Sequence, residues 1–442
     1  MNAWGAALLA LGVGLSVEAA QQPNVVILFS DDAGYADFGF QPNVVDEMRH
    51  RTPHIDSIAR DGVRFTDAYV SGAVCSPSRA GLMTGRYQQR FGYDNNLPPG
   101  TKDGLDLKET FGSKRMQELG YKTGLVGKWH LGYPDAFHPN KRGWDWFYGL
   151  LQGSRGYHPS PTVSAHRVIQ ENGKATKEEG YVTDRFGDAA CRFIRANKSA
   201  PFYLFVSFTT PHAPNQPKKS DLPRVADIEG KQRKAHCGLL ISLDDNVGKI
   251  LACLQDEGLA ENTLVIFTND NGGATHTGAK NTPLLGKKGN LTEGGIRVPM
   301  VMRWPGTIPK GSVVEDPVIT LDFLPTMVEM AGHAVDAEWK LDGRSLLPLL
   351  KGESKALAER PLFWRKAGSG GARAMRKGPW KVVHDRREKE APKLFNLADD
   401  ISESTDLANK GEAHKKRLAG MLAEMDAWES EMEEPRWGAG KK

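Results

Sequence analysis

Three short apolar runs, rich in β-branched and aromatic residues, most constrain the fold of this 442-residue chain. They span residues 24–29, 202–208 and 263–268, and such runs are typical of strands buried on both faces of a sheet. Each run leads into polar residues that are unusual after a buried strand, namely Asp31-Asp32, Thr209-Thr210-Pro211-His212 and Asn269-Asp270-Asn271-Gly272-Gly273.

Helical patterns lie between these runs, at residues 55–61, 110–119, 182–197 and 233–257. Strands that alternate with helices predict an α/β sheet covered by helices on both faces. Open α/β sheets bind ligands outside the carboxyl ends of their strands. The sequence therefore predicts that the polar residues after the three runs meet in one site.

The length of the chain favours one large domain and a smaller one. We expect a catalytic α/β domain over residues 21–350 and a C-terminal α+β subdomain over residues 351–442. The subdomain contains short strand patterns at 361–366, 372–375 and 380–384, and the charged segment 410–442 has the pattern of a solvated helix. Residues 134–177 lack periodicity and are predicted to form a long loop region that shapes a pocket.

The composition and the first residues bear on partners and location. With 58 basic against 54 acidic residues, net charge gives no reason to expect nucleic acid as a partner. An apolar stretch from Ala6 to Val17, followed by small residues, predicts a signal peptide over residues 1–20 and a secreted or periplasmic protein. This stretch is shorter than the roughly 20 residues of a membrane span, and we expect no span elsewhere. Oligomeric state is not predicted.

The four cysteines do not indicate a disulfide scaffold. Cys237 and Cys253 lie in one predicted helix, where sixteen residues correspond to roughly 24 Å, so they cannot pair with each other. We expect both to be small buried side chains.

Cys75 lies in a different context, the segment Val-Cys-Ser-Pro-Ser-Arg-Ala-Gly-Leu-Met-Thr-Gly-Arg at residues 74–86. Pro77 suits the first turn of a helix and Gly85 its end. Cys75 is therefore predicted at a helix N-terminus, where free N–H groups and a partial positive charge suit a tetrahedral anion.

This segment resembles the modification signature of the type I sulfatases, Cys-x-Pro-x-Arg followed by Thr-Gly, at Cys75, Pro77, Arg79, Thr84 and Gly85. A second family motif, Gly-Tyr-x-Thr-x-x-x-Gly-Lys-x-His, is matched by residues 120–130, and similar features continue through residues 293–299 to 394–397. The resemblance implies an alkaline-phosphatase-like α/β fold, a mixed sheet sandwiched by helices, with a smaller C-terminal α+β subdomain.

By this resemblance, a separate maturation enzyme oxidises Cys75 to formylglycine, whose hydrated aldehyde carries two geminal hydroxyls. One hydroxyl attacks sulfur, and the other lets the sulfated intermediate release sulfate and regenerate the aldehyde. The implied activity is sulfatase, the hydrolysis of sulfate monoesters.

The polar strand ends predict a metal site. Asp31, Asp32, Asp270 and Asn271 offer only oxygen ligands, and three converging carboxylates would repel one another without a cation. We therefore expect these residues to bind a hard divalent ion. Calcium is the usual ion of the family and magnesium is possible.

Further site residues come from the same motifs. Arg79, one helical turn after Cys75, can brace the nucleophile and the metal carboxylates. If their segment is extended, Lys128 and His130 point the same way; the family match assigns Lys128 to sulfate binding and His130 to deprotonating the second hydroxyl. His212 and Lys288 are the candidates for protonating the leaving oxygen, and Lys288 is preferred over Lys287 from its spacing to Glu293.

The long, His-rich loop region favours a sulfated carbohydrate as substrate, such as an algal polysaccharide or a glycosaminoglycan oligosaccharide. Ser154, His158, His276 and Arg373 are candidates for substrate contacts. Two alternatives stay open: a phosphonate monoester or phosphodiester hydrolase of the same superfamily, and a non-catalytic carbohydrate-binding relative.

Overall fold

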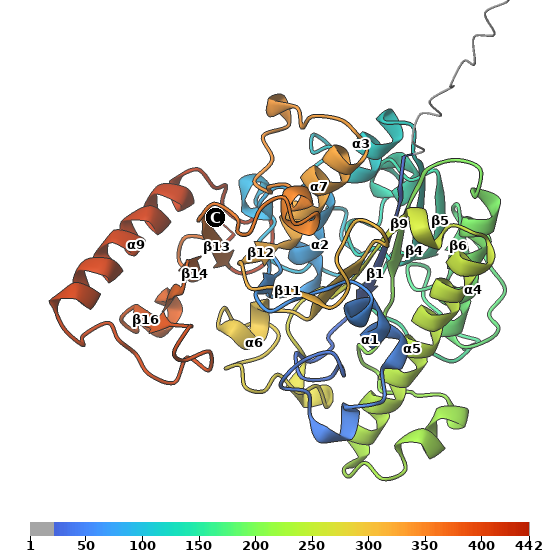
Figure 1. Cartoon of the computed structure of the whole chain (residues 1–442), viewed down its shortest axis with the longest axis horizontal. Helices are drawn as coiled ribbons and strands as arrows, with labels where there is room; N and C mark the ends of the chain where they lie inside the picture. The colour runs from blue at the N-terminus through green and yellow to red at the C-terminus, as the bar shows by residue number, and fades with distance from the viewer. Residues whose placement is uncertain (1–21, 442) are drawn as a thin grey trace, which may run out of the picture.

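A large mixed sheet forms the centre of the molecule (Figure 1). The computed structural model describes residues 22–441, so the expected signal peptide lies outside the described residues. In this range the sheet has the strand order β11-β2-β10-β9-β1-β8-β4-β5-β6-β7. Its strands are β1 (Asn24–Ser30), β2 (Val63–Phe65), β4 (Lys122–Lys128), β5 (Trp146–Leu150), β6 (Gln170–Glu171), β7 (Lys174–Ala175), β8 (Phe202–Ser207), β9 (Thr263–Asn269), β10 (Met300–Arg303) and β11 (Ser312–Val314).

The strands predicted from the three apolar runs are neighbours at the centre of this sheet. β1 pairs in parallel with β9 on one side and β8 on the other, so Ile27 lies between Ile266 and Phe205. β4 continues the parallel order beyond β8, whereas β10 pairs with β9 in the antiparallel sense. The carboxyl ends of β1, β8 and β9 therefore meet at one edge, as predicted.

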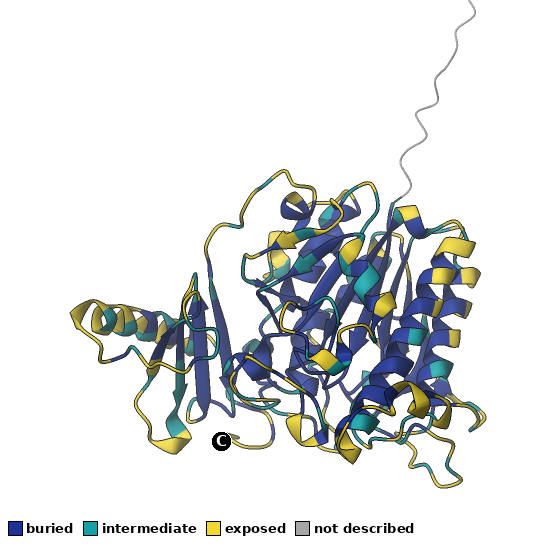
Figure 2. Ribbon diagram, turned by 60° about the horizontal axis from the view of Figure 1, so that its bottom comes forward, coloured by how far each residue is buried: buried dark blue, intermediate teal, exposed yellow. Residues whose placement is uncertain are grey.

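Helices cover both faces of the sheet because the side chains of its central strands are buried alternately on each side. Val25, Ile27 and Phe29 of β1 face one hydrophobic core, and Val26 and Leu28 face the other. The first core includes residues of α2, α3 and α7, and the second includes residues of α1, α4 and α5. These helices are α1 (Pro53–Arg60), α2 (Cys75–Thr84), α3 (Gly112–Glu118), α4 (Val182–Ala196), α5 (Lys231–Asp256) and α7 (Phe323–Met330). Figure 2 shows the buried strands between helices whose outer faces are exposed.

A second, antiparallel sheet forms the C-terminal part of the molecule, with the terminal helix packed on it (Figure 1). This confirms the predicted strand patterns and terminal helix. The elements are β13 (Pro361–Lys366), β14 (Ala372–Lys377), β15 (Trp380–Asp385), β16 (Lys393–Asn396) and α9 (Glu412–Ser430). Their core also contains Tyr69, Ala73 and Tyr87 from the first part of the chain. The domain boundary at residue 350 stays a prediction.

Shorter elements join the two sheets. β3 (Ala68–Tyr69) and β12 (Val318–Ile319) form a two-stranded parallel ladder, and α6 (Glu293–Ile296) and α8 (Leu347–Leu350) are single-turn helices. Within residues 22–441, no helix combines the length and the apolar character that crossing a membrane requires.

β4 and β5 were not predicted as strands, and β5 lies inside the segment interpreted as a long loop. The glycines of β4 obscured its pattern but have a packing reason. A side chain at Gly124 would meet the ring of Phe193 at 2.6 Å, and one at Gly127 would meet the carbonyl oxygen of Ser207 at 1.9 Å. Only glycine lets the neighbouring strand and helix approach β4 this closely.

Candidate active site

Cys75 is the first residue of α2, as its sequence context predicts. Val74 before it is extended, Pro77 lies in the first turn, and Gly85 ends the helix at φ 68°. The Cys75 side chain is buried, with 2% of its surface exposed. The structure therefore places the sulfur at a helix N-terminus, inside the molecule rather than on its surface.

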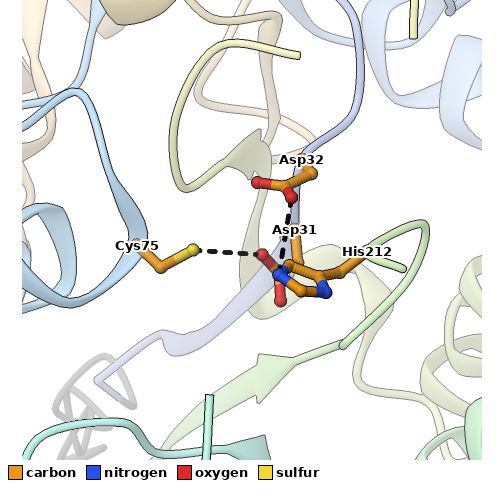
Figure 3. Close-up of side chains that lie close together, drawn as sticks. All are labelled: Asp31, Asp32, Cys75 and His212. Carbon is orange, nitrogen blue, oxygen red and sulfur yellow. Dashed lines mark hydrogen bonds and ion pairs between the residues drawn. The ribbon is translucent and has the colours of Figure 1, made fainter. Parts of the chain in front are cut away.

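Polar residues that follow two strands converge on Cys75 (Figure 3). Asp31 and Asp32 follow β1, and His212 follows β8. One potential ligand atom of each of these residues and Cys75 lies within 4.8 Å of the others. Asp31 Oδ1 is 3.6 Å from Cys75 Sγ, and His212 Nε2 is 3.6 Å from Asp32 Oδ2.

Three cations pair with the carboxylates of this site. Lys128 Nζ lies 2.8 Å from Asp31 Oδ2, and Lys288 Nζ lies 2.8 Å from Asp32 Oδ2 and 3.2 Å from Cys75 Sγ. Arg79 donates to Asp270 Oδ2 through both Nε (3.1 Å) and Nη2 (2.9 Å). The predicted roles of these residues are thus compatible with their positions.

The charges in the site influence one another strongly because most of them are buried and the Lys288 side chain is only partly exposed. Burial alone would raise the pKa of Asp270, but Arg79 and Lys128 lower it below the usual value. Burial, followed by the charge of Asp270, raises the pKa of the Cys75 thiol to about 12. Burial would lower the pKa of Lys288, but Cys75 and Asp32 raise it well above its usual value. At neutral pH Lys288 is therefore a cation and Cys75 a neutral thiol, which is a poor nucleophile.

The oxygen atoms of the site fit a hard divalent cation. Asp31, Asp32, Asp270 and Asn271 are all buried at the carboxyl ends of β1 and β9. Asn271 Nδ2 donates to Asp32 Oδ1, whereas Asn271 Oδ1 has no hydrogen-bond partner among the described residues. A buried carbonyl oxygen without a donor is costly unless a cation or another donor satisfies it.

His130 differs from the expected geometry. β4 ends at Lys128, and His130 has φ 62°, so the two residues do not share the simple alternation of an extended strand. The imidazole is 8% exposed, and Nδ1 has no hydrogen-bond partner among the described residues. Burial, with the positive charge of Lys128, lowers the pKa of His130 well below its usual value. His130 is therefore a neutral base.

Ser76, Tyr93, Asn96 and Ser207 support the site and were missed in the sequence. Ser76 Oγ lies 2.6 Å from the Tyr93 hydroxyl and donates to the carbonyl oxygen of His130 at 2.8 Å. The Ser76 amide donates to Asn96 Oδ1. Ser207, the last residue of β8, accepts from Arg79 Nη1 at 2.5 Å. Two of them carried a signal in the sequence, since Ser76 is next to Cys75 in the motif and Ser207 lies within the apolar run 202–208.

The candidates for substrate contacts are not all brought together. Ser154 follows Gly153, where a side chain would meet the His130 ring at 2.4 Å, so Ser154 lies beside the site. His158 is exposed and packs on Tyr181, and His276 is exposed after β9. Arg373 of β14 pairs instead with Asp426 and Glu429 of α9. The guanidinium of Arg373 is thus directed to the terminal helix, which differs from the substrate contact predicted for it.

Comparisons with known proteins agree with this fold. The family model described as Sulfatase matches residues 23–333, and that described as N-sulphoglucosamine sulphohydrolase, C-terminal, matches residues 286–429. The dog (Canis lupus familiaris) N-acetylgalactosamine-6-sulfatase is 33% identical over 82% of this chain and 72% of that protein. Human arylsulfatase A is 34% identical over 82% of this chain and 74% of that protein.

Among solved structures, the crystal structure of Ps i-CgsB in complex with k-i-k-neocarrahexaose superposes with a TM-score of 0.89. It is 35% identical, with 96% of each chain covered. An α/β sheet with a cysteine, carboxylates and cations at its carboxyl edge is the architecture of the type I sulfatases, in the alkaline phosphatase superfamily. The chain belongs to the sulfatase family and is a sulfatase.

Proposed function

We propose that this sulfatase hydrolyses sulfate monoesters on a sulfated carbohydrate, with residue 75 as formylglycine and with a bound calcium ion. The observation that carries the proposal is the convergence of Cys75 with three carboxylates and three cations at one sheet edge. A buried thiol with a pKa of about 12 is poorly suited to attack sulfur directly, which favours the modified residue.

Each group would have a separate part in the reaction. Hydrated formylglycine would supply one hydroxyl that attacks sulfur and a second that allows sulfate to leave. Lys128 and Arg79, whose side chains are buried, would offset the negative charge of the sulfate group. Lys288, which is protonated, and His212, which is 21% exposed, are placed to donate a proton to the oxygen of the leaving alcohol. Neutral His130 is suited to accept the proton of the second hydroxyl.

Calcium would be held by Asp31, Asp32, Asp270 and Asn271 and would bind a sulfate oxygen as a Lewis acid. Magnesium is the alternative ion. Asp32, the second acidic residue after β1, pairs with Lys288 and Asn271, so the ion and the protonating lysine would share one carboxylate.

The substrate class rests on the relatives. A solved structure at 35% identity carries a neocarrahexaose, and relatives at 33% identity are N-acetylgalactosamine-6-sulfatases. We therefore propose a carrageenan-type or glycosaminoglycan oligosaccharide as substrate. A secreted or periplasmic location would bring the enzyme to such polymers, after a maturation enzyme has modified Cys75.

Two measurements test the proposed function. Mass spectrometry of the peptide that contains residue 75, from a host with the maturation enzyme, should show the aldehyde rather than the thiol. Free sulfate should then be released from at least one member of a panel of defined carrageenan and glycosaminoglycan oligosaccharides, and Cys75→Ala should abolish the release. An active preparation with an intact thiol contradicts the mechanism. Release of phosphonate but not sulfate from matched aryl esters favours the phosphonate alternative.

A further inference from the structure

Two cavities lie on either side of the segment that carries Lys288. The first, the α5 cavity, lies between the start of α5 and residues 275–286, with a volume of about 630 Å³. The second, the β15 cavity, lies between residues 285–292 and the C-terminal sheet near β15, with a volume of about 460 Å³. Both are large enough for a sugar unit.

The two cavities carry opposite charge. The β15 cavity is lined by five carboxylates, among them Asp385, Glu388 and Asp406, against the cations Arg387 and Lys393. The α5 cavity is lined by the cations Lys231, Arg233 and Lys280 and by no carboxylate. A polyanionic chain is therefore attracted by the α5 cavity and repelled by the β15 cavity.

Two of the cations in the α5 cavity are free to bind a ligand. The third, Arg233, already forms ion pairs with Asp37 and Glu47. Lys231 and Lys280 are exposed, and neither ammonium forms an ion pair with the described residues.

The α5 cavity is connected to the active site by short hydrogen-bonded links. Gly286 lines the cavity, and Lys288, two residues later, donates its backbone N–H to Gly273 after β9. On the other side, Asn215 Nδ2 donates to the carbonyl oxygens of Gln232 and Thr277, which ties the loop after His212 to the cavity wall. The cavity therefore adjoins the side of the site where His212 and Lys288 would face the leaving alcohol.

We propose that the α5 cavity is a second anion subsite, in which Lys231 and Lys280 bind a further sulfate or carboxylate group on the sugar next to the cleaved ester. The proposal rests on the proposed hydrolysis of carbohydrate sulfates. It directs the substrate chain toward α5 and away from the acidic β15 cavity, so densely sulfated oligosaccharides bind better than sparsely sulfated ones.

The test measures binding by calorimetry to the full chain with Cys75→Ala, which lacks the nucleophile and cannot react with the substrate. The probes are iota-neocarratetraose, the less sulfated kappa-neocarratetraose and a chondroitin 6-sulfate tetrasaccharide. Lys231→Ala and Lys280→Ala should each weaken binding of the most sulfated probe that binds by about threefold or more, and the double variant by about tenfold. Lys393→Ala, which removes a cation of the β15 cavity, is the matched control and should have no effect.

The loss in the lysine variants should be larger for iota-neocarratetraose than for kappa-neocarratetraose and should shrink at high salt. Equal affinities for the parent and both lysine variants, or a loss confined to Lys393→Ala, would overturn the subsite. So would a parent that binds none of the probes although the mature enzyme releases sulfate from 4-nitrophenyl sulfate. Absence of sulfate release from every ester contradicts the proposed function itself.

Discussion

Trp437, near the C-terminal end of the sequence, packs edge-on against Tyr93, with ring centroids 4.5 Å apart and ring planes at 85°. The Tyr93 hydroxyl contacts Ser76, the residue after Cys75, and Ser76 donates to the carbonyl oxygen of His130. Trp437 Nε1 also donates to the carbonyl oxygens of Asn95 and Asn96. Trp437 thus braces residues that hold Cys75 and His130 in place.

Trp437→Ala should lower kcat by about tenfold while KM changes little, because small displacements of reacting groups slow catalysis more than they weaken substrate binding. Trp437→Phe keeps an aromatic ring against Tyr93 and should restore most of the activity. Steady-state kinetics of sulfate release measure both variants. A kcat that stays unchanged in Trp437→Ala would show that the bracing has no catalytic role.

Lys288 and Lys287 are neighbours with different surroundings, which offers a matched pair. Lys288 contacts Asp32 and Cys75, whereas Lys287 is exposed. Lys288→Ala should lower kcat by about a hundredfold or more, as expected for loss of a group that stabilises or protonates the leaving oxygen. Lys287→Ala should stay within about twofold of the unsubstituted enzyme. Similar losses in both variants would mean that charge along the segment, rather than the position of Lys288, matters.

Some of these site residues could be predicted from the sequence and others could not. The strand ends Asp31, Asp32 and Asp270 were predicted to converge because parallel strands share an edge, and they do. The choice of Lys288 came from a motif spacing. No local pattern could indicate Trp437, whose contacts with residues 93–96 span more than 340 positions.

Backbone conformation was another feature that could not be predicted from the sequence. The left-handed turn at His130 has no glycine to signal it, and the glycines of β4 hide a strand that only packing explains. Arg373 could be read as a substrate contact only because its acidic partners on α9 are far away in the sequence.

Lys381 is a buried cation that joins β15 to α6 and to the segment after β16. Its side chain is inaccessible and lies 2.7 Å from Glu293 Oε1 and 2.8 Å from Glu403 Oε1. Lys381→Met should lower the free energy of unfolding by about 3 kcal/mol or more because two buried carboxylates each lose an ion pair, Glu293 retaining that with Arg297. Lys377→Met removes a half-exposed pair with Glu424 and should cost less than about 1 kcal/mol. Urea denaturation compares the two, and equal effects would contradict the role of burial.

The same cluster should make stability depend on acid pH. Burial alone would raise the pKa of Glu293, but Lys381 and Arg297 lower it from 4.5 to about 2. Because the folded-state pKa is depressed, the contribution is present above about pH 4.5 and is lost as the pH falls toward 2. Between these values the unsubstituted protein should lose about 2 kcal/mol more than Glu293→Gln does. Parallel stability curves for the two proteins, measured by thermal melting at each pH, would refute the assignment.

Removal of the metal should be visible without any substrate. If Asp31, Asp32, Asp270 and Asn271 bind calcium, saturating calcium at about 100 times Kd stabilises the folded state by about 2.7 kcal/mol, and EDTA reverses the gain. Asn271→Ala removes the buried carbonyl oxygen that has no hydrogen-bond partner among the described residues, and it should reduce the calcium-induced rise in Tm. Asn24→Ala, the same substitution at the opposite end of β1, where the buried Asn24 Oδ1 accepts from the amide of Phe202, serves as the matched control and should keep the full rise. A rise that is the same in both variants would place the ion elsewhere, and a larger rise with magnesium than with calcium would identify magnesium as the ion that these oxygen ligands prefer.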